Sequence, residues 1–341
     1  MLLEPRQEEI LLAVIREYIQ TAEPVGSAAL LQKYALGCSS ATVRNEMARL
    51  EEMGFLVQPH TSAGRVPLDK AYRFYVDRLL EKRIVPPPEA SLIAREFEDD
   101  HELESLIDHT RRRLSQLTRY TSVVLGPQLR CSVLKYLQLI RLGPRQVLLV
   151  MMTCSGTVVH RVIELSVDAA GEDFESTTAM LNDRLRGMSL EAIRPAFLRT
   201  LTPSVAPEIA ARVGEITSEM ASCQGSRLFY EGASNLLGQP EFQDVGKARG
   251  LLELLEQESL LAEILDKSLP MEGVAVVIGG EHPLSQMREC TLVTATYHLG
   301  GVAVGTVGVI GPMRLRYDRV ISIVSCVAEV FGRRLSAAAQ R

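Results

Sequence analysis

The chain has 341 residues, of which 46 % are hydrophobic, and a formal net charge of −5. This length predicts two or three domains with substantial cores, and the acidic balance excludes a protein that coats nucleic acid through its overall charge. The six cysteines form neither a CxxC pair nor a metal-binding spacing, so we expect free thiols in a reducing compartment.

The first residues do not have the composition of a secretory signal peptide. These residues, MLLEPRQEEI, include acidic side chains before any apolar run. No apolar stretch reaches the length needed to cross a bilayer. We therefore expect a cytoplasmic protein with no membrane partner.

Two helices are predicted before residue 35. Pro5 suits the first turn of a helix over 4–21, whose apolar side chains recur at helical spacing. The EPVG segment at 23–26 ends this helix, and a short second helix covers 27–34. Residues 35–38 then turn the chain into a third helix.

The segment 39–70, SSATVRNEMARLEEMGFLVQPHTSAGRVPLDK, predicts a helix, a short strand and a basic loop in that order. Ser39 or Ser40 can cap the helix, and Gly54 supplies the left-handed position that ends it. At about 100° per residue, three apolar side chains fall in one stripe that must face a core. They are Val43, Met47 and Leu50.

The opposite face of this helix suits DNA. Two alanines on it let the backbone approach a surface, and Arg and Asn make bidentate contacts with guanine and adenine edges. Taken alone, the face could equally carry ordinary solvated charges, because Glu46, Glu51 and Glu52 would repel phosphate. The strand at 55–57 and the loop that follows have the order of a DNA-binding wing, which favours DNA reading.

The candidate DNA-binding residues divide into two groups. We expect Arg44 and Asn45 to read bases, and Arg65, at the tip of the loop, to meet phosphate or the minor groove together with Lys70. The full candidate set is Ser39, Ser40, Thr42, Arg44, Asn45, Arg49, His60, Thr61, Ser62, Arg65 and Lys70.

Three segments resemble the HrcA family of heat-inducible transcription repressors. They are residues 39–80, LFYEGASNLLGQPEFQDV at 228–245 and CTLVTATYHLGGVAVGTVGVIGPMRLRYDRVISIV at 290–324. The resemblance implies an α+β protein: an N-terminal winged helix-turn-helix, then a GAF-like domain interrupted by an inserted dimerisation domain. It also implies a bacterial, homodimeric repressor of chaperone operons. Such a repressor binds an inverted-repeat operator in double-stranded DNA, is released on heat shock and is modulated by chaperonin.

We expect four segments from these patterns. Residues 1–85 form the DNA-binding domain and end near PPP at 86–88. As the resemblance implies, residues 86–167 begin the GAF-like domain, 168–240 form the inserted dimerising domain, and 241–341 complete the GAF-like domain. The sequence leaves open where the insertion begins and whether some of the strands before residue 168 belong to it. Residues 91–119 predict one long charged helix, or two, in which RRR at 111–113 reads better as part of an amphipathic scaffold than as a second nucleic-acid site.

The remaining elements alternate in type. Strands are predicted at 134–142, 146–152 and 157–165, then helices at 173–186, 190–201, 207–221 and 226–237. Strands return at 273–279, 290–297 and 301–310, and a last helix covers 318–337. We expect the N-terminal helices to complete a core of their own. The two-fold contact is expected at the apolar residues Leu228, Phe229, Tyr230, Leu236 and Leu237.

The sequence offers no catalytic or metal-binding pattern. The glycine-rich stretch 300–311 lacks the Gly-Lys-Ser/Thr ending of a phosphate-binding loop and predicts a strand pair instead. The six histidines show no ligand spacing, and no nucleophile, base and orienting group can be selected. We therefore expect a protein that is not an enzyme and needs no cofactor. A metabolite-sensing transcriptional regulator, using the GAF-like domain, is the alternative.

Overall fold

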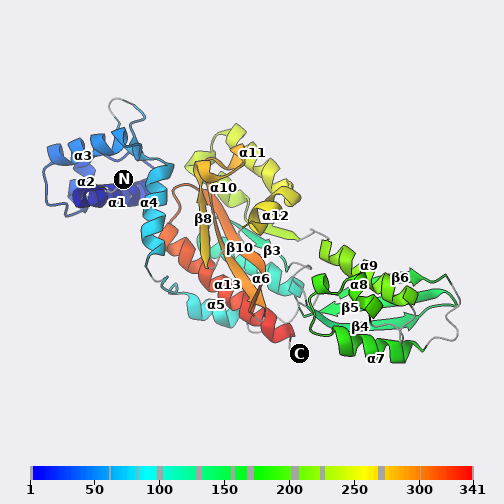
Figure 1. The fold of residues 1–341 in the computed structure, drawn as a ribbon. Coiled ribbons are helices and arrows are strands. Elements are labelled where there is room, and N and C mark those ends of the chain that lie inside the picture. Colours follow the sequence, from blue (N-terminus) through cyan, green and yellow to red (C-terminus); the bar gives the residue numbers. More distant parts are fainter. Residues whose placement is uncertain are drawn as a thin grey trace.

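The computed structural model describes residues 3–60, 63–82, 84–97, 103–127, 133–154, 158–166, 173–200, 207–222, 227–267, 273–299 and 301–339. The fold is α+β, and the described strands form three antiparallel sheets. Three parts follow one another along an elongated molecule (Figure 1). We call residues 3–82 the head, residues 84–127 and 227–339 the body, and residues 133–222 the inserted domain.

The head contains the predicted three helices and short hairpin. They are α1 (Pro5–Thr21), α2 (Ser27–Lys33), α3 (Ser40–Glu52), β1 (Leu56–Val57) and β2 (Val66–Pro67). The two strands pair antiparallel, with Leu56 opposite Pro67. A fourth helix, α4 (Asp69–Leu80), leads from the hairpin towards the body. The expected stripe of α3 is buried: Val43 and Leu50 are fully inaccessible and Met47 is nearly so.

The body is built on a five-stranded antiparallel sheet in the order β7-β3-β10-β9-β8. These strands are β7 (Leu228–Glu231), β3 (Thr121–Leu125), β10 (Val302–Pro312), β9 (Cys290–Leu299) and β8 (Val274–Ile278). The predicted strand pair around the glycine-rich stretch is confirmed, because β9 and β10 pair along most of their length.

Helices cover both faces of this sheet. One face is covered by α6 (Leu103–Thr118) and α13 (Tyr317–Ala339), with α5 (Ala90–Glu96) packed on α13. The other is covered by α10 (Ser234–Leu237) and α12 (Glu258–Asp266), with α11 (Val245–Glu256) packed beside α12. Short 3-10 turns lie at η4 (Pro240–Phe242), η5 (Gly279–Glu281) and η6 (Ser285–Met287). The α11–α12 pair and strand β3 are elements that the sequence patterns did not predict.

The inserted domain has a sheet and a core of its own. Strands β4 (Leu134–Arg141), β5 (Gln146–Thr153) and β6 (Val158–Glu164) form a three-stranded meander. One face packs on α7 (Phe174–Leu185), η3 (Leu190–Ala192), α8 (Pro195–Thr200) and α9 (Pro207–Ser222). Every buried residue of this hydrophobic cluster lies between Leu134 and Val213.

The predicted limits of the inserted domain are therefore wrong at both ends. The strands placed in the first part of the GAF-like domain (86–167) pair only with one another, and they belong with the helices that follow. At the other end, the helix predicted over 226–237 is instead strand β7 followed by the short α10. β7 pairs with β3, so Leu228 and Leu236 are buried in the body core.

Polar contacts fasten the head to the body through α4. An Asp69 carboxylate oxygen accepts a 2.7 Å hydrogen bond from the Gly280 amide. Arg73 donates from Nε to Glu281 Oε1 at 2.6 Å and from Nη2 to the Val276 carbonyl oxygen at 2.6 Å. These bonds hold the first two turns of α4 on the η5 turn and on the edge strand β8.

Aromatic packing completes this junction. The Tyr317 ring lies 6.0 Å from the Tyr72 ring and 6.2 Å from the Tyr75 ring, and burial raises the pKa of the Tyr317 hydroxyl far above its ordinary value. The protonated hydroxyl donates to the Met313 carbonyl oxygen at 2.6 Å. One hydrophobic cluster runs from α1 and α3 through these rings into the body. The expectation that the head completes a separate core is therefore wrong.

Candidate nucleic-acid interface

The N-terminus of α3 is held by hydroxyl groups. Ser39 is the cap, and its Oγ accepts a 3.2 Å hydrogen bond from the Thr42 amide. The hydroxyls of Ser27 and Ser40 are hydrogen-bonded at 3.0 Å, which ties the first residue of α3 to the first residue of α2. Of the two serines that could cap the helix, Ser39 does so, and Ser40 joins the two helices.

Arg44 and Asn45 lie on the exposed face of α3. Among the described residues, neither side chain forms a hydrogen bond or an ion pair. The helix that carries them is rigidly placed, since its other side is buried and Gly54 ends it with a φ of +75°. Two side chains with bidentate hydrogen-bonding capacity thus project into solvent from a fixed support.

Arg49 lies one turn after Asn45 and is anchored. Its Nη1 donates to Glu46 Oε1 at 3.1 Å, and Gln7 Nε2 of α1 donates to Glu46 Oε2 at 3.1 Å. Glu46 is 8 % exposed, whereas the Arg49 side chain is 60 % exposed. The expectation that Glu46 presents a negative charge to phosphate is therefore wrong, because this carboxylate is buried and paired.

Arg65 is not at the tip of the hairpin connection, as predicted, but at its base. Its side chain is 15 % exposed, and Nη2 forms a 2.9 Å ion pair with Glu51 of α3. Glu51 Oε1 also accepts a 3.0 Å hydrogen bond from the backbone N–H of Gln58, at the other end of the connection. Glu51 thereby holds both ends of the connection against α3, and its charge is balanced by Arg65.

The base of the hairpin is locked to the turn between α1 and α2. Val25 and Arg65 exchange two backbone hydrogen bonds of 2.9 and 2.8 Å. A Cβ on Gly64 would lie 2.4 Å from the Val25 carbonyl group, so only glycine permits this approach. His60 is exposed beyond this base, while Thr61 and Ser62 lie outside the described residues.

The Lys70 side chain contacts the C-terminal end of α3. Its Nζ donates a 2.9 Å hydrogen bond to the Met53 carbonyl oxygen and lies 4.3 Å from the centre of the Phe55 ring. A cation at this position favourably meets the negative end of the helix dipole. Lys70 and Arg65 thus both have protein partners, and these partners lie in the last turn of α3 or at its end, about two turns beyond Arg44 and Asn45.

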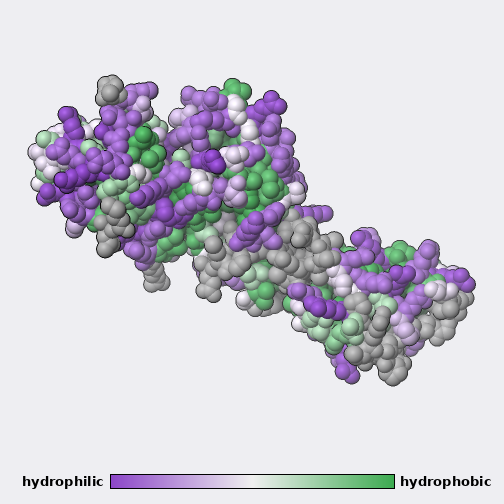
Figure 2. All heavy atoms as spheres, turned by 45° about the horizontal axis from the view of Figure 1, so that its top comes forward, coloured by the Kyte–Doolittle hydropathy of each residue, from purple (hydrophilic) through white to green (hydrophobic). Residues whose placement is uncertain are grey.

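The surface of the head is predominantly hydrophilic on the side shown in Figure 2. This character agrees with a face that meets a polar partner, whereas the apolar side chains of α1 and α3 are turned inward. None of the described helices combines the length and the apolar character needed to span a membrane.

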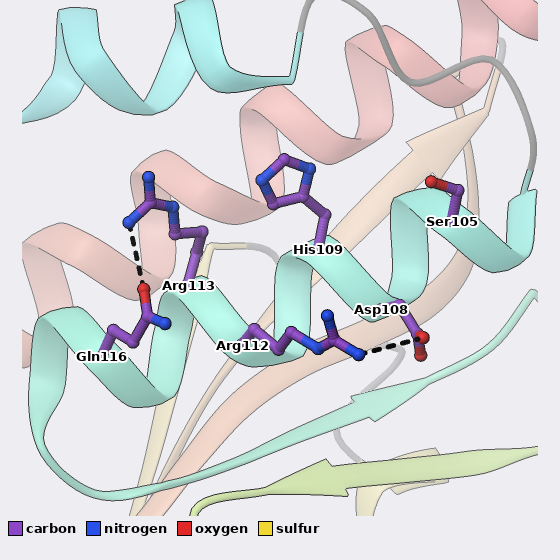
Figure 3. A pocket seen from close by; sticks show the side chains of 6 residues that line it. All are labelled: Ser105, Asp108, His109, Arg112, Arg113 and Gln116. Carbon is purple, nitrogen blue, oxygen red and sulfur yellow. Dashed lines mark hydrogen bonds and ion pairs between the residues drawn. The ribbon is translucent and has the colours of Figure 1, made fainter.

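Two arginines of α6, Arg112 and Arg113, line a concave region of the body (Figure 3). This pocket has a volume of about 650 Å³ and is lined by Ser105, Asp108, His109, Arg112, Arg113 and Gln116. The three arginines have acidic partners: Arg111 and Arg112 pair with Asp108 at 2.9 and 3.8 Å, and Arg113 pairs with Glu96. The paired charges agree with the scaffold interpretation of this helix.

Among the described residues, no three His, Cys, Asp or Glu side chains come together as a metal ion requires. Cys38, Cys154, Cys290 and Cys326 are free thiols. Burial raises the pKa of Cys290 to about 12, so this thiol stays protonated.

The sequence did not predict the supporting roles of Gln7, Glu46 and Glu51 in this region. The spacing of Glu46 and Arg49, three residues apart on one helix, is a recognisable ion-pair signal. Gln7 and Arg65 carry no comparable signal, because their partners lie on other elements.

Comparison with known proteins gives a consistent result. Residues 104–321 match the family described as the HrcA protein C terminal domain. "Heat-inducible transcription repressor HrcA" of Pelotomaculum thermopropionicum is 42 % identical over 95 % of this chain and 94 % of its own length. The protein of that name from Geobacter sulfurreducens is 38 % identical over 97 % of both chains. A solved structure, "Crystal structure of a hypothetical protein at 2.2 A resolution", aligns over 99 % of this chain and all of its own, with a TM-score of 0.66 and 25 % identity.

Proposed function

The chain belongs to the HrcA family of heat-inducible transcription repressors, and from this premise we propose that it is a dimeric repressor that reads an inverted-repeat operator with α3. The observation that carries the proposal is the pair Arg44 and Asn45, exposed and without a protein partner among the described residues, on a helix whose other side is packed against the head. These two residue types recognise guanine and adenine edges in the major groove.

We propose that α1–α3 and the β1–β2 hairpin form a winged helix-turn-helix. In this arrangement α3 enters the major groove with its N-terminal half, and Ser39, Ser40 and Thr42 approach the phosphates beside it. His60, Thr61 and Ser62 belong to the wing. Arg65 and Lys70 support the interface through Glu51 and Met53, so they set the position of the wing and of the helix.

The body is proposed to be GAF-like. It has a five-stranded antiparallel sheet with helices on both faces, in agreement with the fold implied by the resemblance. We assign it the role of a rigid support, because α4 is bonded to η5 and β8 at three points. The head then takes its orientation from the body.

We propose that the inserted domain joins two copies through the open face of its sheet. The face of β4–β6 opposite α7–α9 carries exposed apolar side chains on all three strands. They are Tyr136, Ile140, Met152, Val158 and Val162. An apolar face of this kind on a soluble protein is typical of an interaction site, and a two-fold contact would match the symmetry of an inverted repeat. This replaces the contact expected at five apolar residues of β7 and α10, namely Leu228, Phe229, Tyr230, Leu236 and Leu237.

Heat is proposed to act through stability. Natural domains are only marginally stable, so a modest rise in temperature can open a weakly anchored unit and abolish operator binding. A chaperonin that binds the opened chain and assists its refolding would then modulate the amount of active dimer. Chaperone operons are the proposed targets, as the family resemblance implies.

The test is a footprint on an inverted repeat upstream of a chaperone operon, with purified protein and no small molecule, at growth temperature and above it. We expect protection at the lower temperature and its loss on heating. In Arg44→Ala and Asn45→Ala, operator binding should weaken by about 1–3 kcal/mol each and discrimination against altered bases should relax. Binding that requires an added metabolite would support the ligand-sensing alternative, and unaltered specificity in both variants would contradict the assignment of α3.

A further inference from the structure

A buried chain of hydrogen bonds runs from the start of α1 to the exposed face of α3. The Glu4 amide donates to Gln7 Oε1 at 3.2 Å, Gln7 Nε2 donates to Glu46 Oε2 at 3.1 Å, and Arg49 Nη1 donates to Glu46 Oε1 at 3.1 Å. Gln7 and Glu46 are 7 % and 8 % exposed. Side chains from two helices thus converge on one carboxylate, that of Glu46.

The direction of each bond in this chain is determined. A backbone N–H can only donate, so the Gln7 group that faces the Glu4 amide must be the carbonyl oxygen. The Gln7 amide nitrogen therefore points to Glu46, which needs a donor on that side. This arrangement also forms the capping box of α1, so the Gln7 side chain is held by the helix start itself.

Glu46 is an unusual residue for this position. A buried carboxylate is costly unless its oxygens have donors, and here one oxygen is satisfied by α1 and the other by Arg49. The Arg49 side chain remains largely exposed, and a guanidinium has five N–H donors. One of its donors is therefore anchored by Glu46, while others stay available to an external acceptor beside Asn45.

We propose that Gln7 and Glu46 are positioning residues that hold the Arg49 guanidinium in the orientation in which it reads a guanine edge of the operator. The inference rests on the proposed DNA-binding function and adds to it a third base-reading residue with its support. Arg44 is different, because it has no partner among the described residues and must be ordered by the DNA itself. An arginine that is already oriented loses less side-chain freedom on binding.

The experiment measures binding of the full-length protein to the operator and to operators in which each base pair is changed singly. We expect Arg49→Ala to lose discrimination at one base pair in each half-site. Glu46→Gln should reduce discrimination at that same base pair by about 5- to 10-fold, because the single oxygen of the new side-chain amide cannot replace both carboxylate oxygens as acceptors for Gln7 and Arg49. When Arg49→Ala and Glu46→Gln are combined, the loss of discrimination should be no greater than in Arg49→Ala alone.

A matched rescue separates positioning from folding. When Gln7→Glu is combined with Glu46→Gln, the carboxylate introduced at position 7 can accept from the Glu4 amide and from the amide nitrogen introduced at position 46. The new amide oxygen at position 46 then accepts from Arg49. This double variant should recover discrimination, whereas Gln7→Glu alone should not, since it sets two carboxylates against each other. Asn45→Ala serves as the additive control, because its base pair should differ and its loss should add to that of Glu46→Gln.

Three results would overturn the positioning role. They are unchanged discrimination in Glu46→Gln, a loss spread evenly over all sequences, and a loss that adds to that of Arg49→Ala. An even loss would assign Arg49 to phosphate. Failure of the wild-type protein to bind any operator would instead refute the proposed function, so the two failures are distinguishable.

Discussion

The head and the inserted domain are attached to the body in opposite ways. The head shares a hydrophobic cluster with the body, through Tyr72, Tyr75 and Tyr317, and is fastened by the bonds of Asp69 and Arg73. The inserted domain has a separate hydrophobic cluster. The chain enters it after the end of β3 and leaves it before the start of β7, and these two strand ends are paired. The difference indicates that the head and the body form one folding unit, while the inserted domain can open alone.

The largest effect is expected from removing the inserted domain. Leu125 of β3 and Leu228 of β7 are paired, and the Gly126 amide donates to the Arg227 carbonyl oxygen at 2.9 Å. A two-residue Asn-Gly turn can therefore replace residues 127–226 and close a β-hairpin between Gly126 and Arg227. We expect this shortened chain to keep the cooperative unfolding of head and body and to sediment as a monomer.

A full-length variant provides the matched control for this deletion. Val150 lies on the middle strand, opposite Gln138 and His160, on the open face of the sheet. Val150→Glu should also give a monomer, with the inserted domain still folded. A shortened chain that remains a dimer would place the two-fold contact in the body or the head.

The next effect concerns the shared core of head and body. Tyr317 is fully buried between the aromatic rings of α4 and the sheet. Tyr317→Ala should lower the free energy of unfolding by about 3–5 kcal/mol, as for other large aromatic truncations. Amide hydrogen exchange should accelerate in α1, α3 and β9 together while the inserted domain is unaffected. Acceleration confined to the body would show that the head folds independently.

The fold was predictable where the signal is local. The cap at Ser39, the stripe of α3 and the glycine-rich β9–β10 pair each depend on residues close in sequence. The limits of the inserted domain were not predictable in this way, because β7 is defined by its pairing with β3, which lies far earlier in the chain. Its apolar residues fit a helix as well as a strand.

In the candidate interface, too, only the features that depend on nearby residues were predictable. Exposure of Arg44 and Asn45 follows from helical periodicity, since they lie away from the buried stripe. The role of Arg65 depends on where the chain brings Glu51, and its position in a loop of Gly, Pro and hydroxyl residues indicated a tip rather than a base. Side-chain partners across elements are the part that a single sequence does not reveal.

The smallest effect is a pH dependence at the junction. Burial alone would raise the pKa of Glu281, but hydrogen bonds from Arg73 and the Ile278 amide outweigh it and hold the pKa below its ordinary value of 4.5. The stabilisation is therefore present above pH 4.5 and is lost as the pH falls through the lower folded pKa. Because the pair is partly exposed, we expect about 0.5 kcal/mol.

Urea unfolding at about pH 6 and about pH 3.5, on either side of the ordinary carboxyl pKa, would measure this dependence on wild type and on Glu281→Gln. The variant should be slightly less stable at the higher pH, and its stability should fall less on acidification. Equal slopes in the two proteins would contradict a contribution from Glu281 to the junction.

Hydrogen exchange read by mass spectrometry during warming, with operator binding followed in the same samples, tests the central claim most directly. We expect amides of β4–β6 and α7–α9 to lose protection first, because their core is the smaller, separate one, and operator binding to fall at that temperature. Amides of α1, α3, β9 and β10 should open together at a higher temperature. Loss of protection in α1 and α3 before the inserted domain would contradict the account.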